Sequence, residues 1–224
     1  MKEEVIGAKR GTNLRKNGSQ KLKIHINQNK LKNIFLINGP FFIAKNISRS
    51  DLIVRPHDFY MIINNGKEAI KIFYDQEVSN HEIIYDPYKY ENSENINLEP
   101  KNILKKYVVP EGYVDVLAKW YSFKFTYPDY NLIFVRPEFG LSIQTHKYRN
   151  EFWEIIEGHP IIINGNKVYY FVENGTMFEN PINVYHSVIN PNSDVKEFVV
   201  LKEKWSGKFD EKDIERAFNP NHYE

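Results

Sequence analysis

Two stretches of the sequence decide the fold: GLSIQTHKYRNEFWEIIEG at residues 140–158 and GTMFENPINVYHSVIN at residues 175–190. Each contains a histidine that is framed by glycine, proline or asparagine at set intervals. The first motif consists of Gly140, His146, Glu151 and Gly158, and the second of Gly175, Pro181, His186 and Asn190. The intervening residues 159–174 suffice for one short hairpin. In this order and spacing, the two motifs indicate that polar side chains converge from separate strands.

Strand geometry explains the spacing. Side chains of a strand alternate between its two faces, so every second residue of 142–148 is expected to line one polar row. The expected row is Ser142, Gln144, His146 and Tyr148. Glu151 follows a short turn, and His186 arrives from a later strand. Imidazole and carboxylate ligands suit a divalent first-row ion such as zinc, iron, manganese, cobalt or nickel, without selecting one.

The two motifs resemble those of the cupin superfamily. Residues 141–153 are similar to the Leu-Ser-Leu-Gln-x-His-x-His-Arg-x-Glu-x-Trp stretch of type II mannose-6-phosphate isomerases. Residues 207–216, where an acidic turn leads into Asp-Ile-x-Arg, resemble the closing segment of that family. The resemblance covers about residues 121–223. It implies an all-β fold, the cupin double-stranded β-helix or jelly roll, which agrees with the many short strands expected in this half.

The resemblance also implies a ligand set, with one departure. Tyr148 stands where the family has the second histidine of its His-x-His pair, and a phenol with a pKa of about 10 stays protonated and binds metal poorly. Gln144 can replace it, as in the Gln-x-His pair of type I isomerases. The expected metal ligands are therefore Gln144, His146, Glu151 and His186, holding zinc or a similar ion.

Three further residues are candidates for the substrate or the chemistry. The guanidinium of Arg149 can pair with a phosphate or an oxyanion, and its alternative is a salt bridge with Glu151 or a nearby glutamate. Tyr148 and Arg216 are candidates for substrate binding; the alternative for Arg216 is an ion pair on the surface of a helix. Glu151 is the candidate proton carrier if the metal does not fully engage it.

The chain divides into three predicted parts. Residues 1–20 are expected to be a flexible basic leader, residues 21–100 a β-rich accessory or degenerate cupin half with a linker, and residues 101–224 the cupin domain. Asn65-Gly66 predicts a hairpin between the flanking strands. A helical turn is expected at residues 102–106, and a short C-terminal helix at residues 211–217, capped by Asp210.

Composition narrows the partners and the location. A formal charge of +1 gives no general attraction to nucleic acid or to an anionic membrane. No apolar stretch approaches the roughly 18 residues of a membrane span, and residues 1–20 lack a hydrophobic signal core. The absence of cysteine excludes disulfides and thiolate chemistry. We expect a cytoplasmic protein that binds neither nucleic acid nor membrane.

Three hypotheses for the function follow, because the cupin fold hosts many chemistries. The leading one, implied by the resemblance, is a metal-dependent isomerase of the mannose-6-phosphate type, acting on a small-molecule sugar phosphate. The alternative is a non-catalytic sugar- or sugar-nucleotide-binding cupin with a partly lost metal site, which Tyr148 favours. The third is a metal-dependent cupin enzyme with another small polar substrate. Assembly as a homodimer is compatible with all three.

Overall fold

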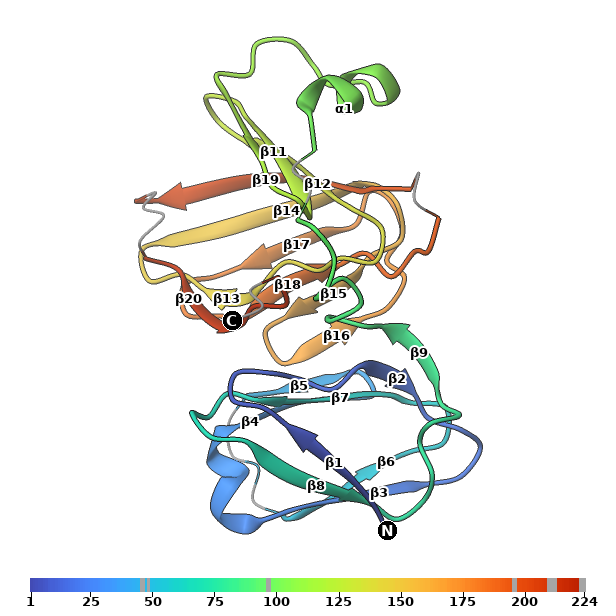
Figure 1. Cartoon of the computed structure of the whole chain (residues 1–224). Helices are drawn as coiled ribbons and strands as arrows, with labels where there is room; N and C mark the ends of the chain where they lie inside the picture. The colour runs from blue at the N-terminus through green and yellow to red at the C-terminus, as the bar shows by residue number, and fades with distance from the viewer. Residues whose placement is uncertain (45–46, 48, 96–97, 195–196, 209–212, 222–224) are drawn as a thin grey trace.

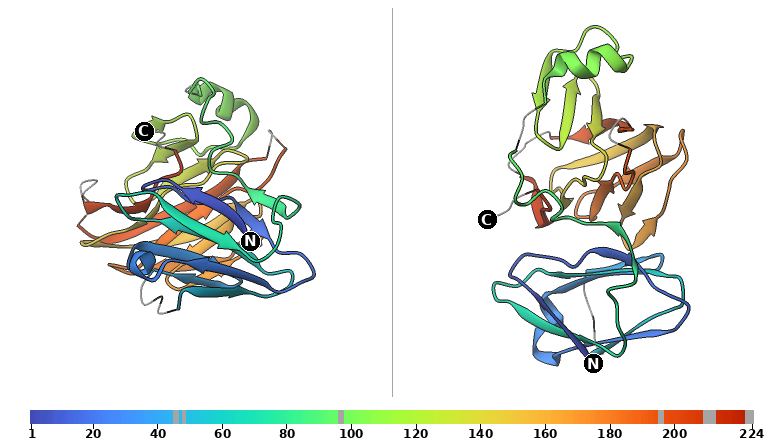
Figure 2. Two further views of the ribbon diagram at one scale, coloured as in Figure 1. Left: turned by 60° about the horizontal axis from the view of Figure 1, so that its bottom comes forward. Right: turned by 45° about the vertical axis from the view of Figure 1, so that its right-hand side comes forward.

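The computed structural model of the protein describes residues 1–44, 47, 49–95, 98–194, 197–208 and 213–221. Strands form most of this part of the chain, in two lobes that are stacked on each other (Figure 1). The views of Figure 2 show the same stacking, with the N-terminus on the lobe far from α1 (Pro100–Lys106). Within the described ranges, no helix has the length and apolar character needed to cross a membrane.

The first lobe consists of two sheets that enclose an apolar core. One has the order β1 (Lys2–Ile6), β8 (Ile70–Tyr74), β3 (Leu22–Ile26) and β6 (Asp51–Val54). Facing it lie β5 (Phe41–Ile43), β4 (Ile34–Asn38), β7 (Phe59–Asn64), β2 (Leu14–Lys16) and β9 (Glu82–Tyr85). The 3-10 helix η1 (Gln28–Asn33) connects β3 to β4. In β3, apolar residues alternate with polar ones, which buries Leu22, Ile24 and Ile26.

The second lobe is the expected jelly roll. One sheet has the order β10 (Asp115–Ala118), β11 (Ser122–Thr126), β12 (Asn131–Val135), β19 (Val199–Gly207), β14 (Arg149–Glu157) and β17 (Met177–Asn180). Opposite lie β20 (Glu215–Phe218), β13 (Ile143–Thr145), β18 (His186–Ile189), β15 (Ile161–Asn164) and β16 (Lys167–Tyr169). The two curled antiparallel sheets confirm the all-β cupin fold.

Strand β14 points its polar end into the barrel. Its burial alternates residue by residue, so Arg149, Glu151 and Trp153 face inward. β13 and β18 approach from the opposite sheet and pair at Gln144 and His186. The functional side chains therefore project from opposing walls into one interior, and helix α1 packs outside that interior through the buried Ile103.

The two lobes share one core. The inner strands of both lobes form a single ten-stranded sheet, joined where Lys167 of β16 pairs with Phe41 of β5. Rings from both lobes pack at this junction: Phe42 lies 5.9 Å from Phe35 and 5.9 Å from Tyr185, between ring centroids. Tyr185 precedes His186, so the first lobe packs directly against the chain that positions that histidine.

Three local predictions differ from the structure. The predicted leader contains β1 and β2, because Ile6 and Leu14 are buried in the cores. Residues 210–212 of the predicted C-terminal helix lie outside the described residues, and Glu215–Phe218 is strand β20 because it pairs with β13. Asn65-Gly66 connects β7 to β8, which belong to different sheets, so this turn makes no hairpin. The helix predicted at residues 102–106 is confirmed as α1.

Replacing Phe42 by alanine tests the shared core. Phe42 is 2% exposed, so Phe42→Ala should lower the free energy of unfolding by about 3–5 kcal/mol. The neighbouring Phe41→Ala, at a side chain that is 53% exposed, should change it by about 0.5 kcal/mol or less. Denaturant unfolding followed by circular dichroism measures both. Equal effects of the two variants would show that the junction contributes no packing energy.

Candidate functional site

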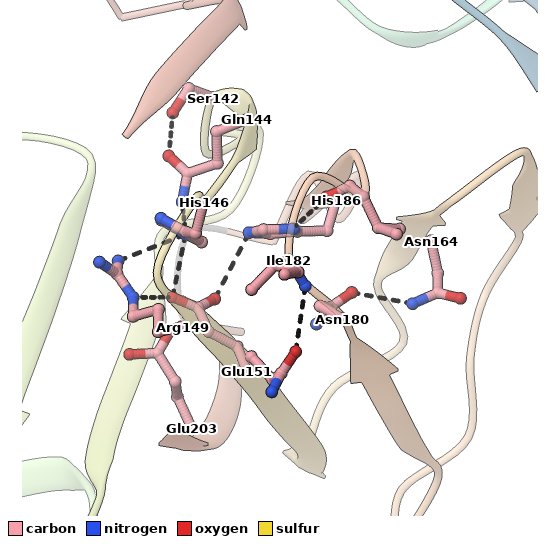
Figure 3. Close-up of polar contacts among 12 residues, drawn as sticks. Ser142, Gln144, His146, Arg149, Glu151, Asn164, Asn180, Ile182, His186 and Glu203 are labelled. Carbon is pink, nitrogen blue, oxygen red and sulfur yellow. Dashed lines mark hydrogen bonds and ion pairs between the residues drawn. The ribbon is translucent and has the colours of Figure 1, made fainter. Parts of the chain in front are cut away.

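His186 faces Glu151 across the barrel interior (Figure 3). Its Nδ1 lies 3.0 Å from the carbonyl oxygen of Val184, and Nδ1 carries the proton because a carbonyl only accepts. In the neutral ring, the lone pair is then on Nε2, which lies 3.4 Å from Oε2 of Glu151. Neither buried atom has a hydrogen-bond partner among the described residues. Two buried acceptors in this arrangement are stabilised by a cation between them.

His146 presents its own lone pair to the same carboxylate. Its Nδ1 lies 3.1 Å from Oδ1 of Asp213, and its Nε2 lies 3.0 Å from Oε1 of Glu151. A carboxylate that accepts from Nδ1 fixes the tautomer with Nε2 unprotonated, as in the carboxylate–histidine–metal arrangement. Asp213 also accepts from the backbone N–H of Tyr148, which holds the loop after β13.

Arg149 supplies a fixed positive charge beside this group. Its Nε donates to Oε1 of Glu151 at 2.9 Å, and its Nη1 donates to Oδ1 of Asp213 at 2.8 Å. Nη2 lies 3.3 Å from Nε2 of His146. The salt bridge with Glu151 that was expected as an alternative is present, and it joins the two buried carboxylates through one guanidinium.

Glu151 is held in its ionised form. Burial raises the pKa of Glu151, but hydrogen bonds and charge from His146 and His186 outweigh it and place the pKa well below its usual range. The Arg149 guanidinium favours the same ionised form. A carboxylate that stays ionised and touches two imidazoles is equipped as a ligand.

The donor atoms of His146, Glu151 and His186 lie within 4.8 Å of one another, and all three residues are buried. Two ligand atoms bound to one ion at about 2.1 Å each are separated by about 3.0–3.4 Å. The observed contacts of Glu151 with Nε2 of His146 and of His186, at 3.0 and 3.4 Å, have this separation. The cluster can therefore hold a divalent ion, and its ligand types leave the choice of metal open.

Gln144 and Tyr148 occupy different places than the single polar row predicted. The Oε1 of Gln144 accepts from Ser142, and its Nε2 lies 3.4 Å from Nε2 of His146. Gln144 thus lies beside His146, and a ligand role requires its amide to turn over. Tyr148 is 56% exposed, because β13 ends at Thr145 and β14 begins at Arg149, which breaks the alternation. The prediction that Tyr148 points into the pocket is wrong.

A cavity of about 120 Å³ lies beside the cluster and is lined by Gln144, Arg149 and Glu151. At about 10–15 Å³ for each water-sized position, this space accommodates on the order of eight or more such positions. Three cationic residues also line it: Lys119, Lys124 and Arg216. The structure thus brings Arg216 to the cavity, from strand β20 rather than from a helix.

Sequence reasoning missed two buried carboxyl groups of this region. Asp213 belongs to the Asp-Ile-x-Arg segment, which was noted only for its resemblance. Glu203 lies on β19 and also lines the cavity. It shares a strand face with the buried Leu201, so extending the predicted strand by two residues would have placed it inside.

Glu203 has an unusual pKa. Burial raises the pKa of Glu203 to about 8, and the charge of Glu151 adds to the rise, while Asn131, Lys124 and Arg149 oppose it. Folding therefore favours the protonated carboxyl.

Metal titration of the protein after dialysis against a chelator tests the cluster. Asp213→Asn should weaken the affinity for a divalent first-row ion by about 10–100-fold, since it removes the acceptor that orients His146. His186→Ala should weaken it further, because it removes a ligand. His159→Ala and Tyr148→His, both at exposed side chains, should leave the affinity unchanged. Equal affinities for wild type and His186→Ala would contradict this assignment.

Comparing wild type with Glu203→Gln over a range of pH tests the buried carboxyl. Between its ordinary pKa of 4.5 and about 8, Glu203 keeps a proton that the unfolded chain releases, so wild-type stability should fall as pH rises. The stability gained by Glu203→Gln should grow from near zero at about pH 4 to on the order of a few kcal/mol at about pH 8. Glu173→Gln, at a side chain that is 82% exposed, serves as the control. A pH-independent difference would show that Glu203 titrates normally.

Comparisons with solved structures find cupins at low identity. A cupin-superfamily sugar phosphate isomerase from Silicibacter pomeroyi is 13% identical, with a TM-score of 0.33 over 39% of this chain and 60% of that chain. A cupin-2 domain protein from Rhodospirillum rubrum is 13% identical, with a TM-score of 0.35 over 50% of this chain and 72% of that one. A salicylate 1,2-dioxygenase from Pseudaminobacter salicylatoxidans is 10% identical, with a TM-score of 0.31 over 90% and 69%.

Similarity at this level carries no argument about activity. The chain spans 60%, 50% and 63% of the length of the first three solved structures that it matches. No curated protein matches it.

The family described as mannose-6-phosphate isomerase C-terminal matches residues 97–219, more than half of the chain. The matched region contains the barrel, His146, Glu151, His186 and the strand β20 that follows Asp213. The chain therefore belongs to the mannose-6-phosphate isomerase C-terminal family of cupins.

Proposed function

We propose that the protein is a metal-dependent sugar-phosphate isomerase that interconverts mannose 6-phosphate and fructose 6-phosphate. The observation that carries this proposal is one cavity with two kinds of lining. Glu151 of the candidate metal cluster lies on one part of the wall, and Lys119, Lys124 and Arg216 lie on another. A sugar phosphate needs both, since its carbonyl end reacts and its phosphate is an anion.

The residues of the chain have separate tasks in this proposal. His146, Glu151 and His186 would hold the ion, which supplies Lewis-acid polarisation of the sugar's carbonyl and hydroxyl oxygens. Arg149 keeps Glu151 ionised, orients His146 through Asp213 and presents its guanidinium to the cavity. The lysines and Arg216 would bind the phosphate.

The proton-carrying role predicted for Glu151 is weakened by its contacts. Its Oε1 accepts from Arg149 and lies against His146, and its Oε2 faces His186. A carboxylate engaged on both oxygens is a poor base toward a C–H bond. Glu151 is better suited to hold the metal than to transfer the proton.

One contact favours the alternative of a non-catalytic sugar- or sugar-nucleotide-binding cupin. Nη2 of Arg149 lies 3.3 Å from the lone pair of His146, so the guanidinium already supplies part of the cluster's positive charge. A pocket balanced by arginine alone would bind an anion without metal. A homodimeric assembly, a cytoplasmic location and the lack of nucleic-acid or membrane partners remain predictions.

Isomerase activity in the presence and absence of metal separates these functions. The protein is treated with chelator, reloaded with one divalent ion at a time, and assayed by NMR for conversion of mannose 6-phosphate. We expect turnover in at least one metal-loaded sample and none after chelation. Binding of the sugar phosphate without turnover in any sample would favour the binding module.

Removing a cavity cation tests the phosphate assignment. Lys124→Ala and Arg216→Ala should each raise the KM for the sugar phosphate by about 10-fold or more, because a hydrogen bond to a charged group contributes about 1.5–3 kcal/mol. Affinity for the unphosphorylated sugar should not change. Lys106→Ala, in the last turn of α1, is the matched control. A similar loss for both sugars would place the phosphate elsewhere.

A further inference from the structure

The cavity contains a second carboxyl group that lies outside the histidine cluster. Glu203 projects from β19, where it pairs with Asn131 of β12 on one side and Trp153 of β14 on the other. It is 8% exposed and lines the same cavity as Glu151 and Arg149. Figure 3 shows it beside these two residues. The Glu203 carboxyl is therefore close to the candidate metal cluster without belonging to it.

The surroundings of Glu203 differ from those of Glu151. One oxygen, Oε1, accepts from Nδ2 of Asn131 at 2.7 Å, which fixes the direction of the carboxyl. Among the described residues, no lysine, arginine or histidine forms an ion pair with Glu203, whereas Glu151 contacts two histidines and Arg149. Such a carboxyl is oriented but can still take up a proton, which a general base requires.

We propose that Glu203 is the acid–base catalyst of this site and moves the proton between C2 and C1 of an open-chain aldose phosphate. This inference rests on the proposed isomerase function. Glu203 takes the proton from C2, and the C–H electron pair forms the C1=C2 bond of an enediolate while O1 gains the charge. The O2 proton then moves to O1, and Glu203 returns its proton to C1, leaving the ketone at C2. C1 is reduced and C2 oxidised within one molecule, so no other reactant is needed.

The electrostatics of the cavity agree with this role. Burial and the Glu151 charge raise the pKa of Glu203 to about 8, so both protonation states are accessible near neutral pH. A base with a pKa near the working pH combines sufficient basicity with the ability to return the proton. Asn131 acts as a positioning residue, because it contacts the carboxyl of Glu203 and does not line the cavity.

Glu203→Gln tests the proposal, since glutamine keeps the shape and can still accept from Asn131. Wild type and variant, each loaded with the metal that supports turnover, are compared in three measurements. These are isomerisation of mannose 6-phosphate, exchange of the C2 hydrogen with deuterium from heavy water, and calorimetric binding of the sugar phosphate. We expect turnover and exchange to fall by about 10²–10⁴-fold, with the affinity for the sugar phosphate changed less than about threefold. Glu173→Gln is the control.

Glu203→Asp provides a second variant should Glu203→Gln fold poorly. It retains a carboxyl, so its turnover should exceed that of Glu203→Gln. Wild-type turnover that survives in Glu203→Gln to within about threefold overturns the role of Glu203 and leaves the isomerase function standing. Equal loss of sugar binding and turnover in both variants also overturns it, because that pattern indicates a structural role. A wild type with neither turnover nor exchange overturns the isomerase function and the Glu203 role together.

Discussion

The buried carboxylate of Glu151 sets the constraint on which the functional half of this protein depends. It faces the Nε2 atoms of His146 and His186 at 3.0 and 3.4 Å, deep in a barrel where an isolated charge is costly. Each ring is held by an acceptor at Nδ1, Asp213 for one and the carbonyl of Val184 for the other. The lone pairs therefore point at the carboxylate, and only positive charge stabilises the arrangement. Arg149 supplies part of that charge, and a divalent ion would supply the rest.

The rest of the fold holds this arrangement in place. β14 contributes Arg149 and Glu151, and β18 contributes His186 from the opposing sheet. Asp213 precedes β20, which pairs with β13 and so brings its carboxylate to His146. The first lobe packs Phe35 and Phe42 against Tyr185, next to His186. This lobe, which has no metal motif, thus has a physical role in supporting the strand that carries one ligand.

The sequence predicts the site only as far as its interactions are local. The spacing of His146, Glu151 and His186 was sufficient, since it follows from strand alternation and one hairpin. Tyr148 was misplaced because the alternation stops where β13 turns into β14. Asp213 and Glu203 could not be placed, since each reaches the site through pairing with strands that are distant in the sequence. The strands at residues 1–20 were missed for the same reason: polar composition hid the pairing of β1 with β8.

Anomalous diffraction from crystals grown with a divalent first-row ion, recorded at the absorption edge of that ion, tests the central claim most directly. The account predicts one strong peak about 2.0–2.2 Å from Nε2 of His146, Nε2 of His186 and a carboxylate oxygen of Glu151. Density with no peak between these residues, and with the Arg149 guanidinium alone balancing Glu151, would contradict it.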